Sequence, residues 1–309
     1  MKAIAALIVI AAAVIVGGGA AQSDMHAPFD KILDTYVREG QVYYRALKLE
    51  RANLDRYVAS LDIGASAQAR MSKPAQQAFW LNAYNALVLR TVIDGYPISG
   101  KAPAYPSNSV RQIPGAFERL KHRVAGESLT LDEIETTKIL PFGDPRMLLA
   151  LGRGALGSNR LRSEAFRGDT LDTQLSEVVK ECVTKEVCFR IDQPARTIEV
   201  SAIFGWHAAA FEKYLSGEAT GPWANRTPLE RAIATMLAPH LFAAERDFLR
   251  ANSFQLKYRD FDWTLNDLTG SGVPGSGVLG SGVLGSAVLG TGVFSTDLAN
   301  WGTGVGRRW

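Results

Sequence analysis

The sequence is poor in the residue types that most often build metal and redox centres. It has only two cysteines, Cys182 and Cys188, and four histidines among its 309 residues. No zinc-type Cys/His spacing is present, since His207 is the imidazole nearest to the cysteines and no further ligands cluster with it. A phosphate-binding P-loop pattern is also missing. We therefore expect neither a metal nor an organic cofactor.

A strong charge of one sign is missing as well. The chain carries 34 Lys and Arg residues against 31 Asp and Glu residues, which gives a net charge of +3. This balance is too small to indicate a nucleic-acid partner. The hydrophobic fraction of 47% is ordinary for a globular protein and ample for a core. The length allows one large domain or two small ones.

The N-terminus has the pattern of a targeting segment. Lys2 is followed by the apolar run 3–16 and by small residues at 17–21. This pattern predicts a signal peptide over residues 1–21 that crosses, or is cleaved at, the inner membrane. An uncleaved anchor is the alternative, but the run is shorter than the roughly 20 residues that a membrane span needs. No cysteine follows the run to carry a lipoprotein anchor, so we expect a periplasmic or secreted protein.

The C-terminal segment 269–309 is of low complexity. From Gly270 it repeats a five-residue unit, Gly-Ser-Gly-Val-Leu with small variations. The repeat has little apolar mass to bury and much glycine, which favours a flexible tail. An elastin-like or β-stacking segment for self-association or surface attachment is the alternative. The folded domain is expected to precede it, over residues 28–268.

Hydrophobic periodicity within this domain predicts more helix than strand. The clearest helix begins after Ser72, has Pro74 in its first turn and ends near Gly95. A hairpin is predicted from 187–191 and 197–200, and a last strand from 254–258. The fold class is therefore α+β, a helix-rich single domain on a small, mostly antiparallel sheet. Further helices are expected at 28–39, 46–61, 129–140, 171–184, 203–215 and 228–252, the last with a break near Pro239, and a buried strand at 146–151.

The long helix carries two amides among apolar neighbours. Asn82 and Asn85 lie one turn apart and share a face, with Tyr84 beside them. A buried amide without partners costs about 1–3 kcal/mol. Either the protein's own backbone or a ligand must therefore bond to these side chains, and we predict all three as binding residues.

The loop after the expected strand at 146–151 contains a glycine pattern and several arginines. Gly152 to Gly157 fits G-x-G-x-x-G, but charged, aperiodic residues follow it instead of a helix, so dinucleotide binding is not expected. The arginines could hold an anionic envelope component, such as a lipid head group or a cell-wall polymer. Alternatively they form a solvated surface with ion pairs to Glu164 and Asp169. They are Arg153, Arg160, Arg162 and Arg167.

Three smaller questions stay open at this point. An oxidising compartment permits a disulfide between Cys182 and Cys188, although two buried thiols would fit equally well. Glu135 is a candidate partner for Arg146. His207 follows a tryptophan on an apolar helix, where an imidazole is more often packed and hydrogen-bonded than catalytic.

The chain resembles the bacterial and plant family called domain of unknown function 547, over about residues 28–267. The similarity is distributed over several blocks, of which Phe79-Trp-Leu-Asn-Ala-Tyr-Asn85 is the most recognisable. The other blocks are Val37–Tyr44, Gly126–Glu135, Asp144-Pro145-Arg146, Ala150-Leu151, Ile203–Trp206 and Asp262–Asn266.

The departures from the family pattern concern its reactive residues. The resemblance implies a His where this chain has Leu148, and an Asn-Cys pair at Gly152 and Arg153. A Gly-Cys-Pro follows in the family, where this chain keeps Gly157 and has Ser158 next. In the family, such a Cys and His would suit thiol chemistry. Thr136 and Ala210 likewise replace a His and an Asp of the family pattern.

This loss of titratable groups from residues 148–159 predicts a non-catalytic member, a pseudoenzyme that acts as a binding or structural module of the cell envelope. Asn82, Asn85, Glu135 and Arg146 would then form a buried polar network. The alternative is a serine- or thiol-type hydrolase or acyl transferase that uses Ser158 as nucleophile and His207 as base. Neither residue lies in a recognised catalytic motif such as G-x-S-x-G.

Overall fold

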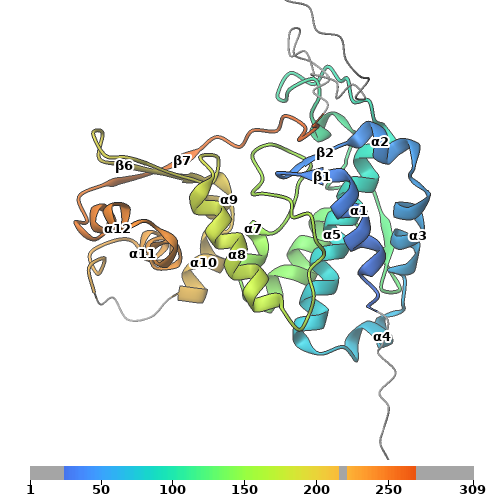
Figure 1. Ribbon diagram of the computed structural model, residues 1–309, viewed down its shortest axis with the longest axis horizontal. Coiled ribbons are helices and arrows are strands. Elements are labelled where there is room, and N and C mark those ends of the chain that lie inside the picture. The colour runs from blue at the N-terminus through green and yellow to red at the C-terminus, as the bar shows by residue number, and fades with distance from the viewer. Residues whose placement is uncertain (1–23, 216–220, 269–309) are drawn as a thin grey trace, which may run out of the picture. The chain divides into compact units, whose positions relative to one another are not determined.

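The computed structural model describes residues 24–215 and 221–268, which belong to one compact unit (Figure 1). The predicted signal peptide and low-complexity tail lie outside the described residues. The expected α+β class is confirmed, because helices dominate and the strands form small antiparallel or mixed sheets. Within the described ranges, no helix is both long enough and apolar enough to cross a membrane.

Helix α5 (Lys73–Gly95) is the central element, and its predicted start and end are confirmed. The Ser72 side chain caps it by accepting a hydrogen bond from the backbone N–H of Ala75. Sixteen of its 23 residues are buried, so neighbours cover it on most sides. Helices α2 (Tyr44–Leu49) and α3 (Ala52–Ser60) pack directly against it.

The N-terminal region is a succession of short elements beside α5 (Figure 1). The single helix predicted over 46–61 is wrong, because residues 50 and 51 separate α2 from α3. This break lets both short helices bury aromatic and aliphatic side chains in the core. The remaining elements are α1 (Ala27–Tyr36), the hairpin β1 (Val37–Arg38) and β2 (Gln41–Val42), and α4 (Ala65–Ala69).

The predicted helix at 129–140 is a composite. A hairpin of β3 (His122–Val124) and β4 (Glu127–Leu129) leads into α6 (Leu131–Glu133), which has a reciprocal Thr130–Glu133 capping box. A π-helical turn, Ile134–Ile139, follows and contains Glu135. Such turns are rare overall, but those that occur often lie at functional sites.

The predicted strand at 146–151 is wrong: its first residues form the short helix α7 (Arg146–Leu149). Met147, Leu148 and Leu149 are all buried, and a short apolar run cannot distinguish a strand from a buried helical turn. The Asp144 carboxylate favours the helical turn by accepting a hydrogen bond from the backbone N–H of Arg146. Helix α7 packs on α8 (Leu171–Thr184). The bounds of α8 are those predicted from the sequence.

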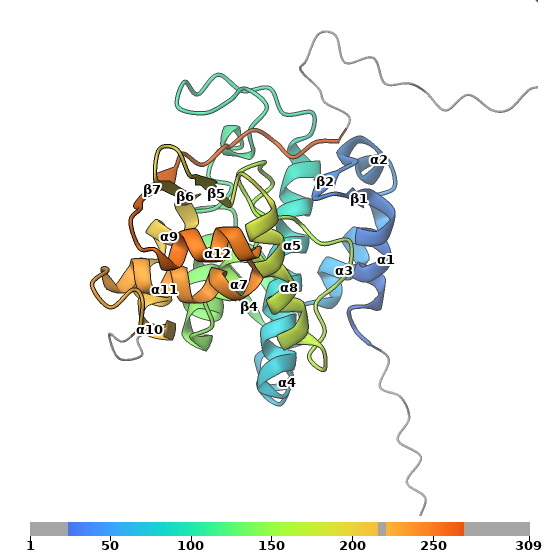
Figure 2. The same ribbon diagram turned by 60° about the vertical axis from the view of Figure 1, so that its left-hand side comes forward.

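The second half of the chain forms a three-stranded sheet with helices against it (Figure 2). Strands β5 (Phe189–Asp192) and β6 (Thr197–Ser201) form the predicted antiparallel hairpin, and β7 (Gln255–Arg259) pairs with β6 in parallel. The structure joins Cys182 at the end of α8 to Cys188 before β5 in a disulfide. The helices between β6 and β7 are α9 (Ala202–Trp206), α10 (Ala208–Leu215), α11 (Pro228–Leu237) and α12 (Ala243–Arg250).

The segment after β7 crosses back over the first half of the chain and positions the site. Its residues form isolated bridges between Ser109 and Thr264, Ala155 and Leu265, and Val42 and Asp267. The backbone N–H groups of Leu156 and Gly157 donate to carbonyls of this segment, each at 2.8 Å. A side chain at Gly157 would begin only 2.6 Å from the Asp262 backbone nitrogen, so this close crossing requires glycine.

Candidate functional site

The two amides of α5 hold the loops that build the site. The Asn82 side chain donates to the carbonyl of Phe166 at 2.8 Å and accepts from the N–H of the same residue at 2.9 Å. The Asn85 side chain donates to the carbonyl of Ala150 at 3.2 Å and accepts from the N–H of Gly152 at 2.8 Å. Both amides therefore bond to the protein's own backbone, the first of the two alternatives that the sequence left open.

Glu135 lies between two basic side chains in the interior. Its Oε1 is 2.9 Å from Nη2 of Arg153 and 2.8 Å from Nε2 of His207. The Arg153 side chain is 4% exposed and that of Glu135 is 11% exposed, so this pair is a buried ion pair. The Tyr84 phenol also lies beside Glu135, and burial together with this carboxylate raises the pKa of the phenol. We call Glu135, Arg153 and His207 the ionic centre.

The ionic centre keeps Glu135 ionised. Burial alone would raise the pKa of this carboxyl group, but the Arg153 guanidinium and the His207 hydrogen bond outweigh burial and lower the pKa to about 2. Burial likewise opposes the charge on Arg153, and Glu135 reverses this effect, so the pKa of Arg153 is raised. A carboxyl group with so low a pKa cannot serve as a general acid near neutral pH.

The candidate nucleophile and base are not joined in the structure. The Ser158 hydroxyl accepts a hydrogen bond from the backbone N–H of Arg153 at 3.0 Å, and Ser158 is only 7% exposed. The Nε2 atom of His207 is occupied by Glu135. Within the part of the chain that the structure describes, no hydrogen bond links Ser158 to His207. A serine hydroxyl without a base in reach is a poor nucleophile.

Arg146 does not take the place that the sequence suggested for it. Its guanidinium pairs with Asp144 at 2.7 Å and with Asp172 at 2.8 Å, whereas Glu135 pairs with Arg153. The predicted single network of Asn82, Asn85, Glu135 and Arg146 is thus wrong. These residues belong to separate sets of contacts, because Arg146 begins a helix that turns its side chain toward α8.

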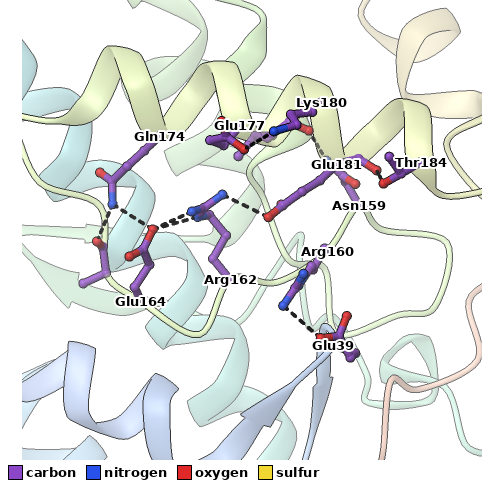
Figure 3. Close-up of polar contacts among 12 residues, drawn as sticks. Glu39, Asn159, Arg160, Arg162, Glu164, Gln174, Glu177, Lys180, Glu181 and Thr184 are labelled. Carbon is purple, nitrogen blue, oxygen red and sulfur yellow. Dashed lines mark hydrogen bonds and ion pairs between the residues drawn. The ribbon is translucent and has the colours of Figure 1, made fainter. Parts of the chain in front are cut away.

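The other arginines of the loop are paired with acidic residues of the chain. Figure 3 shows Arg162 between Glu164 and Glu181, and Arg160 reaching Glu39 on the β1–β2 turn. Arg167 pairs with Asp24 and Asp30. The predicted partner Glu164 is therefore found, whereas none of the ion pairs among the described residues involves Asp169. An anionic envelope component stays a prediction, with the charges of these arginines already balanced inside the chain.

Aromatic side chains cover one side of the ionic centre, and the sequence analysis missed them. Trp206 lies 5.9 Å from the Arg153 guanidinium and 4.9 Å from the Phe261 ring. Trp263 is 4.5 Å from Phe261, and the Arg111 guanidinium lies 4.5 Å from the Trp263 ring. The only signal in the sequence was that Trp206 and Trp263 fall in blocks shared with the family. Tyr105 and Phe117 extend the group, at 6.1 and 5.9 Å from Trp263.

The comparisons with known proteins find one family. Residues 68–183 match the family model described as "Protein of unknown function, DUF547". This part of the chain belongs to that family. The match spans α5 to α8 and includes Asn82, Glu135, Arg153 and Ser158, whereas His207 and Trp206 lie beyond it. No curated protein and no solved structure matches the chain.

The comparison with this family indicates which reactive residues of the family pattern are replaced at the ionic centre. Arg153 stands where the resemblance implies the family's cysteine, and its guanidinium is the group that binds Glu135. Leu148, at the position of the family's histidine, is buried and apolar. A permanently charged, fully paired side chain thus occupies the place of a thiol, and this arrangement supplies charge pairing instead of nucleophilic chemistry.

Proposed function

We propose that the protein is an exported, non-catalytic binding module of the cell envelope, a pseudoenzyme built on the fold of its family. The observation that carries this proposal is the ionic centre: Glu135 is bonded to both Arg153 and His207. The carboxylate, the guanidinium and the imidazole of the ionic centre are thus engaged with one another. The chain keeps the packing residues of the family pattern, and it replaces the reactive residues that the resemblance implies.

The rival function is a hydrolase or acyl transferase that uses Ser158 and His207. It requires the imidazole to take a proton from the serine hydroxyl within hydrogen-bond reach. The His207 Nε2 atom would have to leave Glu135, which would then keep Arg153 as its only basic partner. The Ser158 hydroxyl would also have to come within reach of that imidazole, to which no hydrogen bond joins it among the described residues. These two costs favour the non-catalytic proposal.

Covalent labelling tests the proposal. The folded protein is incubated with a fluorophosphonate probe and assayed against ester, thioester and amide substrates, beside Ser158→Ala and the control Ser163→Ala from the same loop. We expect no labelling at residue 158 and no turnover. Labelling or turnover that Ser158→Ala abolishes and Ser163→Ala preserves would overturn the proposal.

Export rests on the N-terminal pattern of Lys2, the apolar run and the small residues up to Ala21. Mass spectrometry of the protein from fractionated cells tests it. We expect a mature N-terminus at Gln22 and recovery in the periplasmic or extracellular fraction. An intact Met1 on protein recovered from the cytoplasm would contradict export.

A further inference from the structure

A row of aromatic side chains begins at Trp206, beside the ionic centre, and continues with side chains of β7 and of the segment that follows it. Trp206 and Tyr258 are each 48% exposed, although large aromatic residues gain most from burial. The Tyr258 ring packs over Gly205, where a side chain would begin 3.3 Å from the ring. We define the aromatic row as Tyr105, Trp206, Tyr258, Phe261 and Trp263.

Some polar groups in and beside the row form no hydrogen bond to other residues that the structure describes. Neither the Trp206 nor the Trp263 indole N–H donates a hydrogen bond to any residue that the structure describes. The Asp132 carboxylate likewise accepts none within the described ranges, and it lies within electrostatic reach of Arg111 and Arg153 beneath the row. Burial, and then the neighbouring Glu118, raise the pKa of Asp132. Two donors and an acceptor therefore flank the half-exposed ring of Trp206 and the partly buried ring of Trp263.

The charges around the row limit what it can bind. A cationic ligand is disfavoured, because the Arg111 guanidinium already lies among Tyr105, Phe117 and Trp263, and Arg153 lies under Trp206. An anionic polymer or membrane is disfavoured by exposed carboxylates in or beside the same segments. These are Glu118, Asp260 and Asp262. An uncharged ligand with both apolar and hydrogen-bonding surface fits best.

We propose that the aromatic row binds a neutral oligosaccharide; this rests on the proposed binding function and gives it a ligand class. The C–H faces of pyranose rings would pack on Trp206 and Trp263. Their hydroxyl groups would donate to Asp132 and accept from the indole N–H groups. Saccharides combine these two surfaces on one uncharged molecule, and amphipathic aromatic residues suit such mixed contacts.

Calorimetric and tryptophan-fluorescence titrations with chitotetraose, cellotetraose and maltotetraose test the proposal on the mature chain. We expect saturable binding of at least one of them. Trp206→Ala and Trp263→Ala should each weaken binding about tenfold, which corresponds to about 1.4 kcal/mol and is the scale of one aromatic contact. Asp132→Asn should weaken it several-fold. Phe242→Ala, which removes an aromatic side chain that is 78% exposed outside the row, should leave it unchanged.

The outcomes separate this inference from the function on which it rests. No binding of any of the three saccharides by the folded protein, or equal binding by both tryptophan variants, would overturn the inference. Tighter binding of choline, or a dimer that Trp206→Ala dissolves, would overturn it in favour of a cation site or self-association. Mass spectrometry of the bound saccharide is run in parallel. Cleavage of the saccharide would overturn the non-catalytic proposal and leave the binding site standing.

Discussion

The guanidinium of Arg153 lies 2.9 Å from the carboxylate of Glu135, and both side chains are buried. A buried ion pair gains little over an apolar pair of the same shape, but removing one partner leaves an uncompensated charge. The stability of the fold therefore depends on the pair remaining complete. His207 adds a second hydrogen bond to the same carboxylate oxygen.

Arg153→Ala should destabilise the protein strongly. The variant leaves Glu135 buried without its guanidinium partner, beside His207 and the Tyr84 phenol. Breaking a buried pair typically costs about 3–5 kcal/mol. Urea unfolding at pH 7 measures the change. Arg160→Ala, which breaks the more exposed pair with Glu39, should cost less than about 1 kcal/mol. Equal effects of the two substitutions would contradict the distinction between a buried and a surface pair.

The two amides of α5 should stabilise the protein, because they hydrogen-bond to backbone groups that lie outside the helices and strands. Asn82→Ala and Asn85→Ala each leave a backbone N–H and a carbonyl unpaired in the interior, at about 1–3 kcal/mol for each group. Thermal unfolding and amide hydrogen exchange of residues 150–152 and 166 report the loss. Asn53→Ala, which removes an amide at an exposed position of α3, serves as the control. Unchanged exchange in Asn85→Ala would show that the amide does not hold the loop.

Reducing the disulfide should cost little. It closes a loop with a sequence separation of six residues, and so short a loop restricts the unfolded chain by about 2 kcal/mol in the chain-entropy model. Cys182→Ala combined with Cys188→Ala should therefore fold, with its unfolding midpoint lowered by an amount of that order. A double variant that fails to fold would show that the bridge does more than link α8 to β5.

Stability should fall between about pH 6.5 and pH 4 because of His26. Burial, opposed by Asp24 and aided by Arg167, lowers the pKa of this imidazole to about 4. The unfolded chain then binds a proton at a higher pH than the folded protein does. The stabilisation is complete above the ordinary value near 6.5, and it is lost as the pH falls through this window.

The loss attributable to His26 should amount to roughly 3 kcal/mol at most, at about 1.4 kcal/mol per pKa unit. Its Nδ1 atom lies 2.7 Å from the Tyr57 hydroxyl, so the substitution His26→Asn keeps a polar group there without the titration. Urea unfolding of both proteins from pH 7 to pH 4.5 should show a smaller slope for the variant. Titration of His26 near pH 6.5 by NMR would contradict this account.

Short sequence patterns correctly predicted the elements whose ends or turns are marked by capping, proline or glycine residues. Ser72, Pro74 and Gly95 mark the ends of α5, and the turn at residues 192–194 gives the β5–β6 hairpin. The strand predicted at 146–151 failed because a short apolar run has no period that separates a strand from a buried turn of helix.

The ionic centre and the aromatic row could not be predicted in the same way. Arg153 follows a glycine in a loop with other arginines, and only the fold brings it to Glu135 in the π-helical turn. Similarly, Trp206, Trp263 and Tyr105 come from three distant segments. Their meeting depends on the crossing of the segment after β7 over Gly157.

The ionisation of Glu135 tests the central claim most directly. The carboxyl carbon of this residue is followed by NMR through a pH titration of isotope-labelled protein, with Glu135→Gln used to assign the signal. We predict a pKa of about 2, held down by Arg153 and His207 against the effect of burial. Titration at pH 5 or above would show a carboxyl group that is free to exchange protons near neutral pH, and it would contradict the assignment of a non-catalytic centre.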